Sequence, residues 1–266
     1  WPTQPDSARW ERAQERLRLL GALDQKNQLT PEGKQLLHFP IAPHRALFLL
    51  RAAEENNVRI ATRLVALLEE RALQRSTGCD LSHLLQFWNE TVSKGEKGRR
   101  LSFLAQQLEK TVPQLSPPDH SQSNKGVFSL GKLGAMANPS GVAFRRGEEK
   151  GRFLLASGRG AYIPDTDSLY NHQWVVALEV SGSGSDSRIT AALALNPQDL
   201  HQLPESIQQV WLKRERTVLW EQPQQRAVGS EILKWGAITL SEKRIVDLAF
   251  EESLDAWKIY LRREGI

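Results

Sequence analysis

The sequence predicts an α+β protein in which a helical half precedes a small β-barrel and one further helix ends the chain. Apolar residues recur at helical spacing through the first ~140 residues. After residue 141, short β-forming runs alternate with polar turns. They lie near 142–146, 151–156, 174–180, 188–195, 210–220 and 232–240. Five or six short strands within ~100 residues are typical of a small barrel such as an OB-fold.

Start and stop signals divide the helical half. Asp6 can cap a helix that ends at Gly21, and Thr30-Pro31 places an N-cap before a proline at the first helical position. The apolar stripes of the expected helices are Trp10/Ala13/Leu17/Leu20, Leu36/Leu37, Leu47/Leu50, Ile60/Leu64/Leu67/Leu68, Leu81/Leu84/Leu85/Trp88 and Leu101/Leu104/Leu108. The C-terminal helix carries Phe250, Leu254, Trp257 and Leu261 on one face.

Composition places the chain among ordinary globular proteins. It has 266 residues, enough for about two domains, with 40% hydrophobic and 25% charged residues. A net charge of +4 allows a polyanionic partner without requiring one. The single cysteine, Cys79, excludes an internal disulfide and is expected to be a half-buried, inert thiol in a reducing cytoplasm. We see neither a membrane-spanning run nor a secretory signal, and the first residue, Trp1, suggests a chain cut from a longer one.

Three polar segments are interpreted as connections. Residues 93–100 (SKGEKGRR) are predicted to form a solvated loop between helices, with phosphate contact as the alternative. Residues 113–126 contain three prolines and one large apolar residue, which predicts a linker. Ser181 to Ser187 (SGSGSDS) is predicted to be a flexible hairpin tip.

No motif predicts catalysis by this chain alone. Residues 126–133 (GVFSLGKL) nearly spell a phosphate-binding loop, but Leu133 stands where a magnesium-ligating Ser or Thr is needed, so a short helix is the better interpretation. The six histidines show no metal-ligand spacing, and no nucleophile elbow or dinucleotide fingerprint is present. We therefore expect neither a cofactor nor a metal here.

The candidate site is the segment 142–163, where basic side chains project from predicted strands beside aromatic residues. Arg145, Arg146, Arg152 and Arg159 are the expected phosphate contacts, and Phe144 is the expected base-stacking residue. Arg146 and Phe144 share parity and hence a face, whereas Arg145 points the other way unless a bulge intervenes. The alternative is a β-domain with solvated basic side chains. Trp174, Trp211 and Trp220 are interpreted as barrel core, with base stacking as the alternative.

Several segments together resemble one family. Residues 17–50 (LRLLGALDQKNQLTPEGKQLLHFPIAPHRALFLL) and 64–71 (LVALLEER) are similar to the winged helix and helix bundle of DEAH/RHA-type helicases. FRRG at 144–147, RFLLASGRGA at 152–161, GAITLSEK at 236–243 and the closing YLRREGI are similar to the bacterial HrpB subfamily. One departure is Asn138-Pro139-Ser140-Gly141, where the family has an aromatic residue followed by Pro-Asp-Arg.

This resemblance implies a division of the chain and a role for it. The expected parts are a winged-helix-like segment (1–40), a helix bundle (41–112), a linker and short helix (113–140), an OB-like domain (141–245) and a C-terminal helix (246–266). Such a region engages single-stranded nucleic acid, here RNA, over upstream RecA-like motor domains, and ATP and Mg are expected only in that motor. The alternative function is a protein-interaction scaffold that docks on the motor or on an acidic partner. A winged-helix transcription regulator is a weaker third option because no basic recognition helix stands out.

Overall fold

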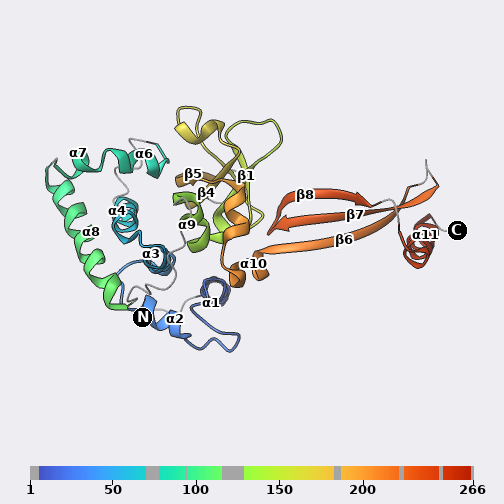
Figure 1. Ribbon diagram of the computed structural model, residues 1–266, viewed down its shortest axis with the longest axis horizontal. Coiled ribbons are helices and arrows are strands. Elements are labelled where there is room, and N and C mark those ends of the chain that lie inside the picture. Colours follow the sequence, from blue (N-terminus) through green and yellow to red (C-terminus); the bar gives the residue numbers. More distant parts are fainter. Residues whose placement is uncertain are drawn as a thin grey trace.

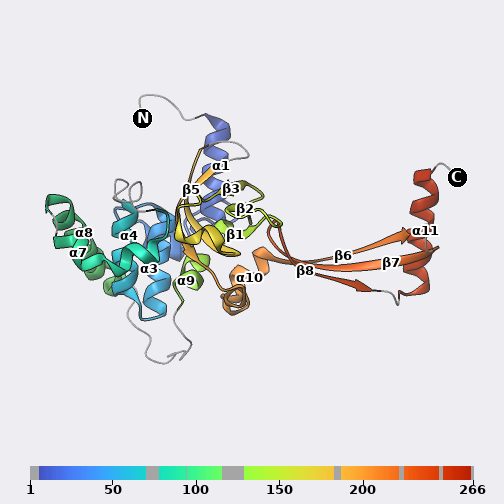
Figure 2. The same cartoon turned by 90° about the horizontal axis from the view of Figure 1, so that it is seen from above.

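A computed structural model describes residues 6–69, 78–93, 95–115, 129–182, 187–221, 225–245 and 248–264. A helical half lies beside a β-barrel, and a long three-stranded sheet projects from the barrel with one helix at its far end (Figure 1). The view from above shows the same projection (Figure 2). This α+β order, helices first, then a closed barrel and a C-terminal helix, agrees with the fold class predicted from the sequence.

The helical half is built around two buried helices, α3 (Pro43–Glu54) and α4 (Val58–Glu69). Leu49, Leu64 and Leu67 on these helices are fully buried. The surrounding helices are α1 (Ser7–Leu19), α2 (Pro31–Leu36), α6 (Leu81–Gln86), α7 (Trp88–Ser93), α8 (Gly95–Leu115) and α9 (Leu130–Ala137). None of the described helices combines the length and apolar composition that crossing a bilayer requires.

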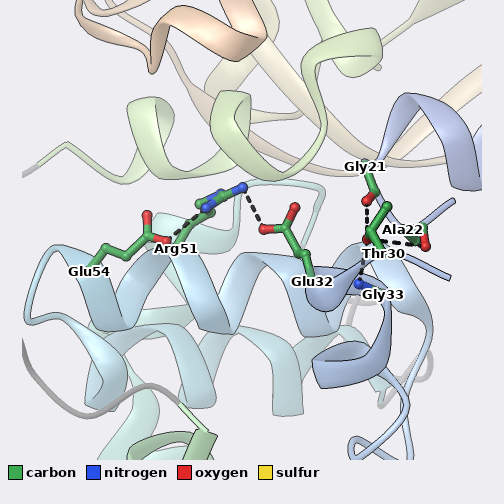
Figure 3. A network of polar contacts seen from close by, with 7 residues as sticks. All are labelled: Gly21, Ala22, Thr30, Glu32, Gly33, Arg51 and Glu54. Atoms are coloured by element: carbon green, nitrogen blue, oxygen red, sulfur yellow. Dashed lines mark hydrogen bonds and ion pairs between the residues drawn. The ribbon is translucent and has the colours of Figure 1, made fainter. Parts of the chain in front are cut away.

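The junction between α1 and α3 is held by a polar network (Figure 3). Thr30 caps α2, since its hydroxyl accepts from the Gly33 amide at 2.9 Å and donates to the Gly21 carbonyl at 2.6 Å. Gly21 has a φ of 73°, which accounts for the end of α1 at this residue. Arg51 on α3 then pairs with Glu32 on α2 at 2.6 Å. The expected Thr30 cap and Gly21 stop are confirmed, whereas the Asp6 side chain makes no capping hydrogen bond at the start of α1.

The barrel closes with five strands in the order β1-β2-β3-β5-β4. They are β1 (Val142–Arg145), β2 (Arg152–Leu155), β3 (Gly160–Tyr162), β4 (Trp174–Ser181) and β5 (Ser187–Ala194). All neighbouring pairs are antiparallel except β3 and β5, which are parallel. Phe153 and Ile189 fill the inside, whereas Val176 and Leu193 face the helical core that includes Leu133 of α9. One barrel wall is therefore covered by the helical half.

The remaining strands form a separate sheet, not part of the barrel. Its order is β6 (Leu212–Glu221), β7 (Arg226–Trp235), β8 (Ile238–Ile245), and α11 (Phe250–Glu264) packs on it. The prediction of a single strand near 232–240 was wrong, because Gly236 and Ala237 form a turn between β7 and β8. The strand expected from 210 also begins later, since α10 (Glu205–Trp211) precedes it. Trp211 therefore lies on a helix, and Trp220 lies outside the barrel on β6.

Other predictions for helices and loops need correction. The loop expected at 93–100 is helical from Gly95 onward, because α8 extends through it. The stripe expected on α1 is not buried, and Trp10 is 56% exposed. On α11, Phe250 is 79% exposed, although the sequence groups it with Leu254 and Leu261 on one apolar face. Residues 116–126 of the predicted linker and 183–186 of the predicted hairpin tip lie outside the described residues.

Candidate nucleic-acid interface

Strand register brings a row of basic side chains together on the outer wall of the barrel. Arg152 on β2 pairs with Tyr162 on β3, and Tyr162 pairs with Arg188 on β5. Arg146, just beyond β1, joins the row because its amide donates to the Arg152 carbonyl at 2.8 Å. Because these four positions are neighbours in register and flank inward-facing residues, their side chains share the outer face. We name Arg146, Arg152, Tyr162 and Arg188 the arginine row.

The arginine row is accessible and carries an aromatic ring. Its three arginines are exposed, and Tyr162 is half-buried. The Arg152 guanidinium lies 5.6 Å from the centre of the Tyr162 ring, a cation–π contact that leaves the charge in place. With neighbouring strands about 4.8 Å apart, the row follows the curved wall for about 14 Å, from β1 to β5 of the closed five-stranded barrel. Such a row places positive charge on the outside of the barrel, where it can attract a polyanion.

Two of the predicted arginines lie elsewhere. Arg145 has the opposite parity from Arg146 and is half-buried, with Nη1 donating to the Asn171 carbonyl at 3.4 Å. Arg159 lies beyond the opposite end of β2 from Arg152, and its Nη2 donates to the Ser187 hydroxyl at 2.7 Å and the Gly182 carbonyl at 3.2 Å. Among the predicted arginines, only Arg146 and Arg152 therefore belong to the row.

Phe144, the predicted stacking residue, lines a pocket beside the row. Its ring lies 4.5 Å from that of Trp174, at an interplanar angle of 41°. The pocket has a volume of about 330 Å³ and opens between the barrel, η3 (Pro197–Gln202) and β8. Phe144 precedes Arg146 by two residues, which is about 7 Å along a strand. Pocket and row are therefore adjacent on the same outer wall.

Several charges on the projecting sheet pair with one another. Lys234 contacts Glu215 at 2.5 Å, Arg216 contacts Glu252 at 2.9 Å, and Arg244 pairs with Glu221. Paired charges of opposite sign give a weak field at a distance. These ion pairs therefore reduce the positive field of the sheet.

The segment 138–141, where the sequence departs from the family that it resembles, joins the helical half, the barrel and the projecting sheet. The Asn138 side chain donates to the Ala177 carbonyl at 2.8 Å, and the Ser140 hydroxyl donates to Asn138 Oδ1 at 2.8 Å. The Pro139 carbonyl accepts from the Trp235 indole. A Cβ at Gly141 would lie 2.1 Å from the Ala177 carbonyl oxygen, so only glycine fits. These contacts give the segment a structural role in this chain.

Other candidate sites have structural explanations. Leu133 of the loop-like motif at 126–133 and Met136 just after it are buried on α9, which Ser129 caps, so the short-helix interpretation is confirmed there. Cys79 is buried, and burial, together with Asp167, raises the pKa of its thiol. A raised pKa disfavours the nucleophilic thiolate. Within the described residues, no group of His, Cys, Asp and Glu is arranged to hold a metal ion.

The chain and its fold are similar to those of known helicases. Residues 13–41 match the model of the helicase associated domain (HA2), winged-helix. The chain is 27% identical over 271 residues to the ATP-dependent RNA helicase HrpB of Escherichia coli (strain K12). The crystal structure of the E. coli DExH-box NTPase HrpB matches 100% of the chain with a TM-score of 0.73 and 26% identity. The chain is homologous to the C-terminal accessory region of HrpB-type helicases.

The match covers nearly all of this chain but only part of each related protein. A second crystal structure, of the Escherichia coli DEAH/RHA helicase HrpB, covers 97% of the chain with a TM-score of 0.71 and 22% identity, which supports the fold. The chain spans 30% of the length of the HrpB protein and of each of these two structures. The fold class predicted from the sequence and the family resemblance are both confirmed for this HrpB-type accessory region.

Two members of the arginine row were missed by sequence reasoning. Tyr162 was recognised only as a β-forming residue, and Arg188 was not singled out. Their pairing joins β3 to β5 in parallel across 26 positions of the chain. The alternation of apolar and polar residues shows that both side chains point outward, but it does not show which strands are neighbours. The signal that was present is the alternation Arg188-Ile189-Thr190, in which an apolar residue separates two polar ones.

Proposed function

We propose that this HrpB-type accessory region engages single-stranded RNA for an ATP-dependent helicase of the bacterial cytoplasm, completing the strand's path over RecA-like motor domains. The observation that supports it is the arginine row beside the pocket of Phe144. ATP and Mg would be bound by the motor domains, and the role of this chain is to hold the strand.

The chemistry of the row suits a sugar–phosphate backbone. Guanidinium groups on neighbouring strands offer several donors to successive phosphates, and the Tyr162 ring offers a surface for a base or sugar. Arg152 and Arg188 flank that ring in register.

A salt titration of binding tests the proposal. The 266-residue chain is titrated with labelled oligo-U and with duplex RNA at increasing salt, and the slope of log K against log salt is measured. We expect oligo-U to bind at low salt with a slope of about −0.7 per phosphate contacted. Tighter binding of the duplex, or no binding of either RNA at low salt, would contradict the proposal.

A second candidate function, a protein-interaction scaffold, has one observation in its favour. The helix α11 exposes Phe250 by 79%, Ile259 by 62% and Trp257 by 41%. Exposed apolar side chains gathered on one element are typical of protein contacts. Absence of RNA binding at low salt, together with binding of purified motor domains that α11 substitutions weaken, would favour this second function.

A further inference from the structure

The pocket beside the arginine row has the lining of a site for a flat, neutral group. The ring pair of Phe144 and Trp174 forms one wall, and none of the lining residues is Asp, Glu, Lys or Arg. Polar groups at the rim come from Gln173, Gln198, His201 and Thr239. Its volume of about 330 Å³ lies at the lower end of the range for small-molecule pockets. A lining of this kind favours an aromatic ring with hydrogen-bonding edges over a phosphate.

The elements around the pocket are fixed by hydrogen bonds. The Ala237 amide donates to the Ala156 carbonyl at 2.9 Å, which holds the β7–β8 turn against the barrel. On η3, the Asn196 side chain accepts from the Gln198 amide at 3.1 Å, and Asp199 accepts from the Ser129 hydroxyl at 2.6 Å. The pocket therefore exists before any ligand arrives, which lowers the entropy cost of binding.

We propose that this pocket binds one unstacked nucleobase of a single strand whose phosphates lie along the arginine row. The inference rests on the proposed function and adds a subsite to it. The step from Phe144 to Arg146 along the strand, about 7 Å, places a base and a nearby phosphate of one strand within reach of the two sites. The amides of Gln173 and Gln198 both donate and accept, so they can pair with the edge of any base.

An RNA strand that lacks its bases but keeps its phosphates distinguishes binding at the pocket from binding at the arginine row. Oligo-U and an abasic strand of equal length are titrated against the 266-residue chain. We expect the abasic strand to bind about tenfold more weakly. The variant Gln173→Ala/Gln198→Ala is expected to reduce this difference, whereas Gln202→Ala, exposed on the same η3 but outside the pocket, leaves it unchanged.

Photo-cross-linking with thiouridine-substituted oligo-U locates the base directly. Adducts at Phe144, Trp174 or His201 are the expected result. Equal affinity for both strands, or adducts only outside the pocket, would overturn the base pocket while leaving RNA binding by the row intact. Failure of oligo-U to bind at low salt would instead overturn the proposed function and, with it, the subsite.

Discussion

The indole Nε1 of Trp235 donates a hydrogen bond of 3.1 Å to the carbonyl oxygen of Pro139, which lies 96 positions earlier in the chain. Trp235 is fully buried at the end of β7, and its ring stacks on that of Trp211 at 6.5 Å. Pro139 belongs to η1 (Pro139–Gly141), directly before β1. This bond therefore fastens the projecting sheet to the barrel, next to the proposed base pocket.

Substitution Trp235→Phe tests that attachment. Phenylalanine keeps most of the buried apolar surface but leaves the Pro139 carbonyl without its donor, which costs about 1–3 kcal/mol. We expect the free energy of unfolding, measured by urea denaturation, to fall by this amount. The control is Trp220→Phe, a half-buried position on β6. Equal losses for the two variants would show that the indole bond has no special role.

The hydroxyl of Thr30 is expected to stabilise the junction between α1 and α2. Substitution Thr30→Ala removes the cap on the Gly33 amide and the bond to the Gly21 carbonyl. Loss of an N-cap costs about 1 kcal/mol. Thr30→Ser keeps the hydroxyl and is the matched control, so its unfolding midpoint should remain near that of the parent. A midpoint for Thr30→Ser as low as that of Thr30→Ala would contradict this role.

Arg45 connects the helical half to the barrel. This buried side chain on α3 pairs with Glu69 on α4 at 2.5 Å and with Glu179 on β4. A register shift at Glu179 marks a bulge in β4 at the pairing position. Arg45→Met leaves a largely buried carboxylate unpaired, at a cost of about 3 kcal/mol in unfolding free energy.

A double variant separates charge from packing at this position. Arg45→Met with Glu179→Gln removes the unpaired charge, so part of the lost stability should return. Additive losses in the double variant, measured by the same denaturation experiment, would show that the two side chains are not coupled.

His44 is expected to make stability depend on pH. Burial first, and then the charges of Arg45 and Arg16, lower the pKa of His44 from its ordinary value of 6.5 to about 4, while Glu69 acts in the opposite direction. Between these two values the unfolded chain binds a proton that the folded chain does not, so stability falls as pH drops below about 6.5 and levels off near 4. His44→Gln should flatten this part of the profile, measured as urea midpoints across that window. A profile unchanged in the variant would contradict the prediction.

Local signals in the sequence were sufficient where the structure depends on neighbouring residues. Thr30, Pro31 and Gly21 mark helix ends correctly because caps and left-handed stops use groups a few positions away. The turn at Gly236 was missed because Trp235 and Ile238 on either side are both buried, so the apolar run looks continuous. The helix through 95–100 was missed because its stability comes from packing of Leu101 and Leu108 further along α8.

The candidate site was only partly predictable for a related reason. Parity correctly separates Arg146 from Arg145, since side-chain alternation is a property of one strand. Membership of the arginine row depends instead on strand order, and the parallel pairing of β3 with β5 has no signal in local sequence. Arg159 was therefore grouped with Arg152 by closeness in sequence, although Arg152 begins β2 and Arg159 lies beyond its other end.

The arginine row makes a selective prediction for RNA binding. Arg146→Gln and Arg188→Gln remove exposed charges from the row, and each should lower the magnitude of the salt slope for oligo-U by about 0.7 per lost contact. Arg159→Gln should change the slope less, because the Arg159 guanidinium already donates to the Ser187 hydroxyl and the Gly182 carbonyl. The control is Arg214→Gln, an exposed charge of β6 that lies near Glu231 at 3.7 Å. Equal slope changes for Arg188 and Arg214 would mean that net charge, rather than the row, determines binding.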